Sequence, residues 1–220
     1  MRLLAILLCC LPIRLFACDL ALVLAVDVSG SVDRHEYRTQ MDGLAAALTD
    51  GIVVDALISQ QARITLVQWS GSSRQRQTIP WTPMLRASDV AAFADRVAGD
   101  PRLWRNYSTA IGEALILSEA LLRDVPCQRK VIDVSGDGVS NEGSDPNDRK
   151  GARAAAGIIV NALAIETDDT DLTAYFFENV IQGEGAFVET AAGFADYPDK
   201  IRRKLQRETT RQFSSLAEQD

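Results

Sequence analysis

The sequence predicts one α/β domain: a doubly wound, mostly parallel sheet with helices on both faces and one antiparallel edge strand. Two observations support this fold class. Apolar runs with the length and β-branched composition of buried strands recur along the chain. Segments with helical periodicity lie between them, and this alternation is typical of a parallel sheet covered on both faces. Neither a linker nor a repeat divides the 220 residues, so we expect a single domain.

The expected strands are short apolar or alternating runs. They lie at 20–26, 63–69, 74–79, 130–134, 158–165 and 185–190. The run at 74–79 is polar and alternating, and Pro80 closes it, which suits an edge strand. The expected helices lie at 33–48, 88–97, 109–123, 147–156, 172–181 and 194–207. Asp33, Ser88 and Asp171 are the expected N-caps, because their side-chain oxygens can accept from the first free backbone N–H groups.

The N-terminal segment, residues 1–17, is typical of an export signal. One basic residue precedes a short apolar run, and Ala17 offers a small residue before a cleavage point. We expect the mature domain to cover 18–207 and a polar tail to cover 208–220. Outside the signal, the sequence shows no apolar run long enough for a transmembrane helix. The predicted location is therefore outside the cytoplasm, in the bacterial periplasm.

Composition excludes several functions. Lys and Arg total 23 against 30 Asp and Glu, for a net charge of −7. This balance disfavours nucleic acids and anionic membranes as partners, because both need a basic surface. His35 is the single histidine, which excludes His-rich zinc sites and leaves little room for a Ser-His-Asp triad.

Cys18 has three competing interpretations. The residues before it resemble a bacterial lipoprotein cleavage site, so Cys18 could carry lipid and anchor the protein to a membrane. Alternatively, Cys18 and Cys127 form a disulfide, since they are the two cysteines left after signal removal and an even count in an exported chain favours pairing. Two unrelated buried thiols are a third interpretation.

Oxygen-bearing side chains gather where the expected strands end. Asp27, Ser29 and Ser31 follow the first strand, Asp137 follows the fourth, and Thr109 opens a helix. In parallel sheets, ligands bind beyond the carboxyl ends of the strands. Two carboxylates and three hydroxyls form a hard-donor set that suits Mg²⁺ or Mn²⁺ better than zinc or copper. The alternative is a structural cluster of caps and turns.

These motifs resemble the von Willebrand factor type A (vWA) domain and its metal-ion-dependent adhesion site (MIDAS). The resemblance rests on Asp-x-Ser-x-Ser at 27–31, the segment 109–115 and Ser-Gly-Asp-Gly at 135–138, and it spans roughly 19–207. The chain looks closest to small exported bacterial vWA-like proteins whose function is not established. Gly136 stands where the family commonly has threonine, and Tyr107-Ser108 replaces the usual glycine before Thr109.

The resemblance implies a role for each residue. Ser29, Ser31 and Thr109 correspond to direct metal ligands, whereas Asp27 and Asp137 correspond to acids that act mainly through bound water. The last coordination position in the family is filled by a carboxylate of a bound protein. The family's sheet also places the first and fourth strands side by side, which would bring Cys18 and Cys127 together and makes the disulfide the preferred interpretation.

The predicted function is metal-dependent binding of a protein that presents an Asp or Glu carboxylate. Trp104 and Tyr107, in the loop before Thr109, are candidates for the rim of the binding surface. We expect no enzymatic activity, since the chain has a single histidine and no Gly-x-Ser-x-Gly motif. The alternatives are a metal-assisted hydrolase and a domain whose metal only stabilises the fold.

Overall fold

A computed structural model describes residues 18–167 and 171–210. Its six-stranded sheet has the order β3-β2-β1-β4-β5-β6, and only β3 runs antiparallel to its neighbour. The predicted fold class is therefore confirmed. The strands are β1 (Cys18–Asp27), β2 (Arg63–Trp69), β3 (Gln75–Pro83), β4 (Cys127–Gly136), β5 (Ile158–Ile165) and β6 (Val188–Ala191).

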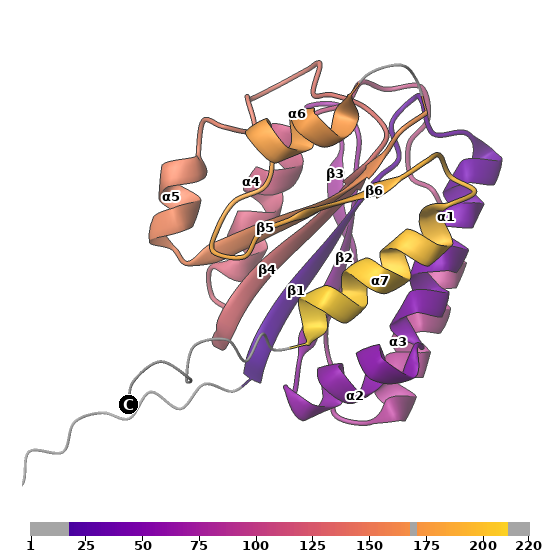
Figure 1. Ribbon diagram of the computed structural model, residues 1–220, viewed down its shortest axis with the longest axis vertical. Coiled ribbons are helices and arrows are strands. Elements are labelled where there is room, and N and C mark those ends of the chain that lie inside the picture. The colour runs from indigo at the N-terminus through magenta and orange to yellow at the C-terminus, as the bar shows by residue number, and fades with distance from the viewer. Residues whose placement is uncertain (1–17, 168–170, 211–220) are drawn as a thin grey trace, which may run out of the picture.

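Helices cover both faces of the sheet (Figure 1). One face carries α1 (Arg34–Leu48), α2 (Gly51–Ser59), α3 (Ala87–Gly99) and α7 (Tyr197–Thr209). The opposite face carries α4 (Ile111–Leu122), α5 (Lys150–Ala155) and α6 (Leu172–Asn179). Alternate residues of β1 divide between the two cores: Leu22 and Leu24 belong to the first, Val23 and Ala25 to the second.

Several elements differ in their bounds from the sequence prediction; for example, α3 begins at Ala87, so Ser88 is not its N-cap, and β4 is longer at both ends. The helix α2 was not predicted, because its opening glycine and β-branched residues are poor helix formers. Asp50 caps it by accepting from the N–H groups of Ile52 and Val53, and its buried side chains pack into the core. The edge strand β3 continues through Pro80 to Pro83, because Pro80 lies at an irregularity of the ladder with β2, where its missing N–H breaks no pairing.

The C-terminal helix also extends further than expected. Helix α7 runs to Thr209, so Glu208 and Thr209 are buried in the domain rather than opening the tail placed at 208–220. The proposed export signal, residues 1–17, and the tail from 211 lie outside the described residues.

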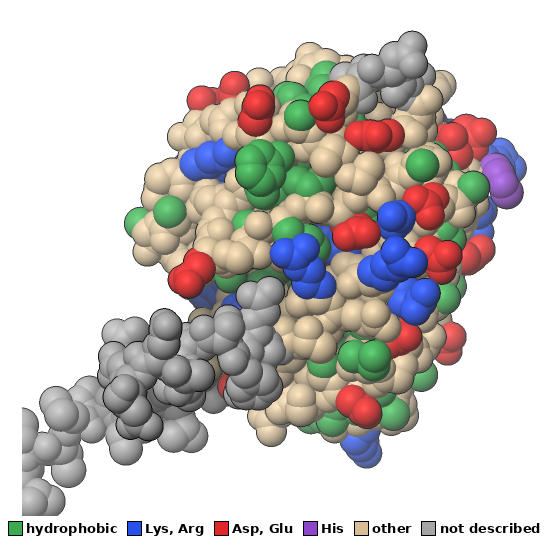
Figure 2. All heavy atoms as spheres, viewed as in Figure 1, with side chains coloured by type: hydrophobic (Ala, Val, Ile, Leu, Met, Phe, Trp, Pro, Cys, Tyr) green, Lys and Arg blue, Asp and Glu red, His purple; other side chains and the backbone are tan. Residues whose placement is uncertain are grey.

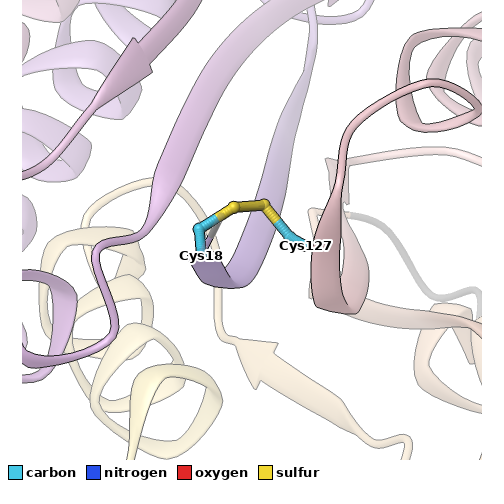
Figure 3. Close-up of a disulfide and its surroundings, with 2 residues drawn as sticks. All are labelled: Cys18 and Cys127. Atoms are coloured by element: carbon cyan, nitrogen blue, oxygen red, sulfur yellow. A yellow bond between two sulfur atoms is a disulfide. The ribbon is translucent and has the colours of Figure 1, made fainter. Parts of the chain in front are cut away.

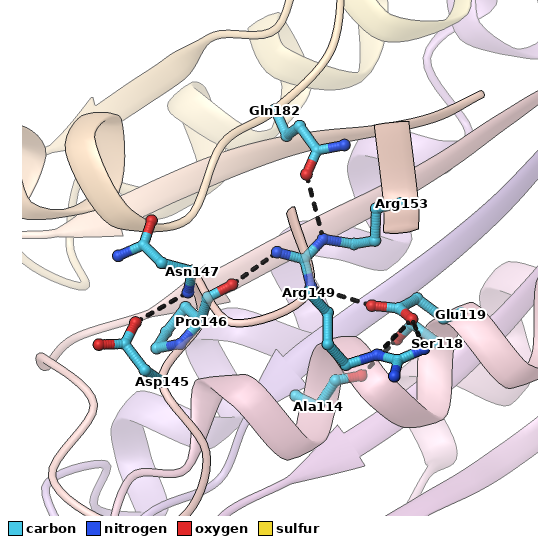
Figure 4. Close-up of polar contacts among 9 residues, drawn as sticks. All are labelled: Ala114, Ser118, Glu119, Asp145, Pro146, Asn147, Arg149, Arg153 and Gln182. Atoms are coloured by element: carbon cyan, nitrogen blue, oxygen red, sulfur yellow. Dashed lines mark hydrogen bonds and ion pairs between the residues drawn. The ribbon is translucent and has the colours of Figure 1, made fainter. Parts of the chain in front are cut away.

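Ion pairs join the helices at one side of the second core (Figure 4). The fully buried Arg153 of α5 lies 2.9 Å from Glu119 of α4, and Arg149 pairs with the second oxygen of the same carboxylate at 2.9 Å. Arg153 also donates to the Pro146 carbonyl, which ties the loop before α5 to the same group. These bonds give the buried guanidinium the partners that it requires.

A disulfide joins the first residues of β1 and β4. Cys18 and Cys127 are register partners, with Cα atoms 4.7 Å apart, and both are buried (Figure 3). The predicted pairing is therefore confirmed. It lies at the amino ends of the two strands, so the carboxyl ends of the same strands lie at the opposite edge of the sheet.

Removing this disulfide should destabilise the protein by up to about 5 kcal/mol, the chain-entropy value for a loop of this size. The loop is long because 109 positions separate the cysteines. We expect the double variant Cys18→Ser/Cys127→Ser to unfold at lower urea concentration than the oxidised protein. Dithiothreitol should shift the wild type in the same direction and leave the variant unchanged; equal midpoints for oxidised protein and variant would contradict the prediction.

A second buried cluster anchors α7 to the sheet. Lys204 Nζ lies 2.5 Å from Asp133 Oδ1 and 2.7 Å from Glu208 Oε1, and Asn161 donates to the same Glu208 oxygen at 2.9 Å. All three charged side chains are buried. Burial, and then Glu208, raises the pKa of Asp133 to about 8, whereas Lys204 lowers it. Asp133 is thus a paired structural acid.

This shift predicts a pH dependence of stability. Since the pKa of Asp133 is raised from 3.8 to about 8, the folded state binds more protons than the unfolded state in this window, and stability falls as pH rises from 4 to 8. We expect Asp133→Asn to remove up to about 1.4 kcal/mol per pH unit of that slope. Urea unfolding across pH 4.5–8 measures it, with exposed Asp55→Asn as control; parallel curves for wild type and Asp133→Asn would overturn the assignment.

Candidate metal centre

The predicted site residues meet at the carboxyl ends of β1 and β4. Asp27 ends β1, and Asp137 directly follows β4. The two strands are adjacent and parallel, with Val26 opposite Ser135, so the residues that follow each strand lie side by side. Strand order changes direction at this pair, since β1 leads outward through β2 and β4 leads outward on the other side. Such switch points are where open α/β sheets bind ligands.

Hydrogen bonds connect four of the five predicted residues. The Ser29 backbone N–H donates to Asp27 Oδ1 at 2.7 Å. The hydroxyls of Ser29 and Ser31 are 3.1 Å apart, and the Ser31 hydroxyl donates to Asp137 Oδ1 at 2.6 Å. We call these four residues the strand-end cluster. Its oxygens come from two strand ends and face one another.

Thr109, the fifth residue, lies against the loop that follows Asp137. Its Oγ1 would be 3.8 Å from a Cβ built at Gly138, and its side chain is buried. The Thr109 N–H donates to the Asn141 side chain at 2.9 Å, so the turn after β4 holds the residue in place. The structure therefore brings all five predicted residues to one edge of the sheet.

The backbone of the 27–31 loop is held from several elements. Its N–H groups at Val28 and Gly30 donate to the carbonyls of Trp69 and Tyr107. Its carbonyls also have donors: Gln40 of α1 donates to Asp27 O at 3.0 Å, and Arg102 donates to the carbonyls of Val28 and Ser29. Because its buried backbone groups have partners, the loop keeps its shape without a ligand. Sequence analysis missed Gln40 and Arg102; a glutamine on the apolar face of a helix was the available signal for Gln40.

The electrostatics of the cluster favour a cation. Asp27 is fully buried, and its Oδ2 has no well-aligned hydrogen bond in the described part of the chain. Burial, and then the Asp137 carboxylate, raises the pKa of Asp27 to about 8, although hydrogen bonds from Ser29 and the Asp137 backbone lower it. A cation among these oxygens would remove the repulsion between the two acids. The donor set of carboxylates and hydroxyls therefore fits a hard divalent ion.

The cluster does not consist of carboxylate, thiol and imidazole groups alone, which are the commonest metal ligands in proteins. Within the described ranges, no group of three or more His, Cys, Asp or Glu side chains is arranged to hold a metal. The cluster has two acids, and hydroxyls make up the rest of its donors. The serine and threonine positions are thus essential to the proposed site.

Gly136 is explained by its neighbours. A Cβ at this position would lie 3.0 Å from Asp27 Oδ2 and 3.3 Å from the indole ring of Trp69, which is fully buried beneath the cluster. Trp69 occupies the space that a side chain at 136 would need. The departure from the family's common threonine therefore accompanies a large aromatic residue on β2.

The turn after β4 also organises the start of α4. Helix α4 has no side-chain cap of its own at Ala110; instead, the Ser140 hydroxyl accepts from the Ile111 N–H at 3.2 Å. Gly112 permits the turn to approach, because a Cβ there would lie 2.1 Å from the Ser144 carbonyl oxygen. This contact holds the segment after Asp137 against the helix that Thr109 precedes.

The two predicted rim residues differ in their environment. Tyr107 is 44% exposed, and the Arg74 guanidinium lies 4.5 Å from its ring centroid. The Tyr107 carbonyl accepts from Gly30, so this aromatic residue borders the strand-end cluster. Trp104 is half-buried and packs against the first core, which leaves less of it available to a partner. His35 is exposed in the first turn of α1.

The surface around this edge is acidic on the face shown in Figure 2. Asp and Glu side chains gather near α6, at the end of the molecule where the strands end, and basic side chains lie lower, over α7. An acidic surface raises the local concentration of cations. The distribution therefore favours metal ions approaching this end of the sheet.

Comparison with solved structures identifies the fold. The fold is that of a vWA domain: a von Willebrand factor type A structure from Catenulispora acidiphila aligns over 87% of this chain and 43% of its own, with TM-score 0.57 and 19% identity. Residues 17–213 match the family model described as protein of unknown function (DUF1194), and the chain belongs to this family.

Two further structures have the same fold. The vWF domain of the type V pili tip protein Mfa5 from Porphyromonas gingivalis aligns over 88% of this chain and 97% of its own, with TM-score 0.59 and 9% identity. Proximal thread matrix protein 1 (PTMP1) from the mussel byssus, in a structure with a zinc-occupied MIDAS motif, aligns over 87% of this chain and 46% of its own. Its TM-score is 0.63 and its sequence identity is 16%. The chain spans less than half of the Catenulispora and mussel structures. No curated protein matches the sequence.

The packing at Gly136 yields a prediction. Gly136→Ala should destabilise the protein by about 1–3 kcal/mol, the usual cost of overpacking, because its Cβ would press on Asp27 Oδ2 and Trp69. Urea unfolding followed by tryptophan fluorescence measures the change. Gly151→Ala is a matched control, since a Cβ there meets nothing within 4 Å. Equal destabilisation of both variants would contradict the explanation.

Proposed function

We propose that this protein is an exported, metal-dependent protein-binding module. The observation that carries the proposal is the strand-end cluster, in which Asp27, Ser29, Ser31 and Asp137 converge from two strand ends with Thr109 beside them. The MIDAS motif of the mussel protein binds zinc in one solved structure, which supports a divalent ion for this fold. We infer Mg²⁺ or Mn²⁺ here, because the donors are all oxygen.

In this proposal, Ser29, Ser31 and Thr109 hold the ion through their hydroxyls, and Asp27 and Asp137 supply the negative charge. The bound ion would offer positive charge and an open coordination position to an Asp or Glu carboxylate of a partner protein. Gln40 and the Tyr107 carbonyl hold the 27–31 loop in place. The stacked side chains of Tyr107 and Arg74 border the path by which a partner would reach the ion. Aromatic and arginine side chains are frequent contributors to binding surfaces.

The burial of Asp27 favours a binding role over a catalytic one. Asp27 is fully buried below the cluster, so it has no access to a substrate as a general base. Pilus proteins among the structural neighbours agree with a binding role. A metal-assisted hydrolase remains the alternative, and turnover of phosphate or acyl esters that disappears in a folded Asp27→Ala variant would support it.

The proposed location is outside the cytoplasm, in the periplasm. The disulfide supports an oxidising compartment. A Cys18 engaged in this bond has no thiol for a lipid, which favours the disulfide over the lipoprotein interpretation. No helix in the described part of the chain is long and apolar enough to cross a membrane.

The proposal predicts saturable, one-site binding of Mg²⁺ or Mn²⁺ in calorimetric titration. Asp137→Ala should weaken binding by at least about tenfold, the cost typical of losing a group that supports a metal site. Ser29→Ala should do the same through loss of a hydroxyl.

The control is Asp124→Ala, which removes an exposed acid near the amino end of β4 and should bind as the wild type does. Circular dichroism checks that each variant is folded. Equal heats for wild type, Asp137→Ala and Asp124→Ala would count against the metal site and against the function that depends on it.

A further inference from the structure

Arg102 is placed by a fully buried glutamine. Gln68 of β2 donates through Nε2 to the Pro101 carbonyl at 3.0 Å and to Asp100 at 2.7 Å, and its Oε1 accepts from the Leu103 N–H at 3.0 Å. These bonds surround position 102 and fix the backbone on both sides of it. The side chain of Arg102 therefore starts from a rigid segment that leads towards the strand-end cluster.

The guanidinium of Arg102 contacts the loop that carries the proposed ligands. Its Nη2 donates to the carbonyls of Val28 at 3.1 Å and Ser29 at 2.8 Å. Arg102 is half-buried, and burial and the nearby Arg105 lower its pKa, whereas Asp27 raises it. An arginine stays protonated under these conditions, so a permanent positive charge lies near Asp27 and the loop that follows it.

The Arg102 charge changes the net charge of the site. The formal charges of Asp27, Asp137 and Arg102 sum to −1 when both acids are ionised, and a divalent ion would bring the net charge to +1. Without Arg102 the sums would be −2 and 0. The exposed Arg105 and Asp33 also face Arg102, and their opposite charges leave the balance unchanged.

We propose that Arg102 is a specificity residue: its charge leaves the metal-loaded site with a net positive charge that selects an anionic ligand. The inference rests on the proposed function, because it presumes that the strand-end cluster binds a divalent ion. The new element is that the affinity of the metal-loaded site for a carboxylate depends on Arg102, a side chain outside the MIDAS-like motifs.

The test uses Mn²⁺ as the metal and acetate as the carboxylate probe. Calorimetry gives the Mn²⁺ affinity, and paramagnetic relaxation of the acetate methyl protons by protein-bound Mn²⁺ gives the acetate affinity. The variants are Arg102→Gln, which removes the charge, and Arg102→Lys, which keeps it. Arg123→Gln is the matched control, since it removes an exposed arginine at the other end of the sheet.

We expect Arg102→Gln to bind Mn²⁺ at least as tightly as the wild type, while the loaded variant binds acetate roughly tenfold more weakly. Arg102→Lys should restore acetate affinity to within about threefold of wild type. The control Arg123→Gln should have the same Mn²⁺ affinity and the same acetate affinity as the wild type. Opposite changes in the two affinities distinguish a charge effect from a loosened loop, which would weaken both.

Three results would contradict the inference. Equal acetate affinities for wild type and Arg102→Gln would remove the role of Arg102 and leave the metal site standing. Parallel losses of Mn²⁺ and acetate in Arg102→Gln would reduce Arg102 to a structural residue. Failure of the wild type to bind Mn²⁺ would instead overturn the proposed function itself.

Discussion

The pairing of β1 with β4 is the constraint on which the rest of the structure depends. The two ten-residue strands run parallel in register, with Cys18 opposite Cys127 at one end and Val26 opposite Ser135 near the other. A shift by one residue would turn each buried side chain to the wrong face. It would also separate the cysteines and the two acids that follow the strands. The disulfide and the strand-end cluster are therefore opposite ends of a single alignment.

The protein buries acidic side chains in two different ways. Asp133 lies 2.5 Å from Lys204, so a fixed cation stands beside its carboxyl group inside the domain. Asp27 is equally buried, yet the group that donates to its carboxylate is the Ser29 backbone N–H, which carries no charge. The neighbouring Ser29 and Ser31 hydroxyls are also neutral, and the nearby charged group Asp137 is a second acid. The first arrangement joins a helix to the sheet. The second leaves negative charge without a fully matching cation, as the proposed metal site requires.

The central strands were predictable because buried parallel strands are continuous apolar runs, and β2 and β5 have the predicted bounds. Helix α2 was not predictable from propensity, since packing of its buried side chains overrides poor helix formers. The five site residues stand in recognisable motifs, and their convergence follows from the strand order. Gln40 and Arg102 both donate to backbone carbonyls. A glutamine on the apolar face of α1 is a signal for Gln40, whereas no sequence pattern marks Arg102 as reaching a carbonyl in a distant loop.

Fold similarity and site chemistry support different parts of the conclusion. Solved structures at 9–19% identity establish the vWA fold, and a fold hosts many functions. The case for metal-dependent binding comes from residues that the fold does not require: the Ser31 hydroxyl, which donates to Asp137, and the Ser29 hydroxyl beside it. A core strand ends equally well with other turn residues. These polar groups converge at the switch point of the sheet, beside a buried Asp27 carboxylate oxygen that lacks a well-aligned hydrogen bond within the described residues, and this placement supports the proposed ligand site.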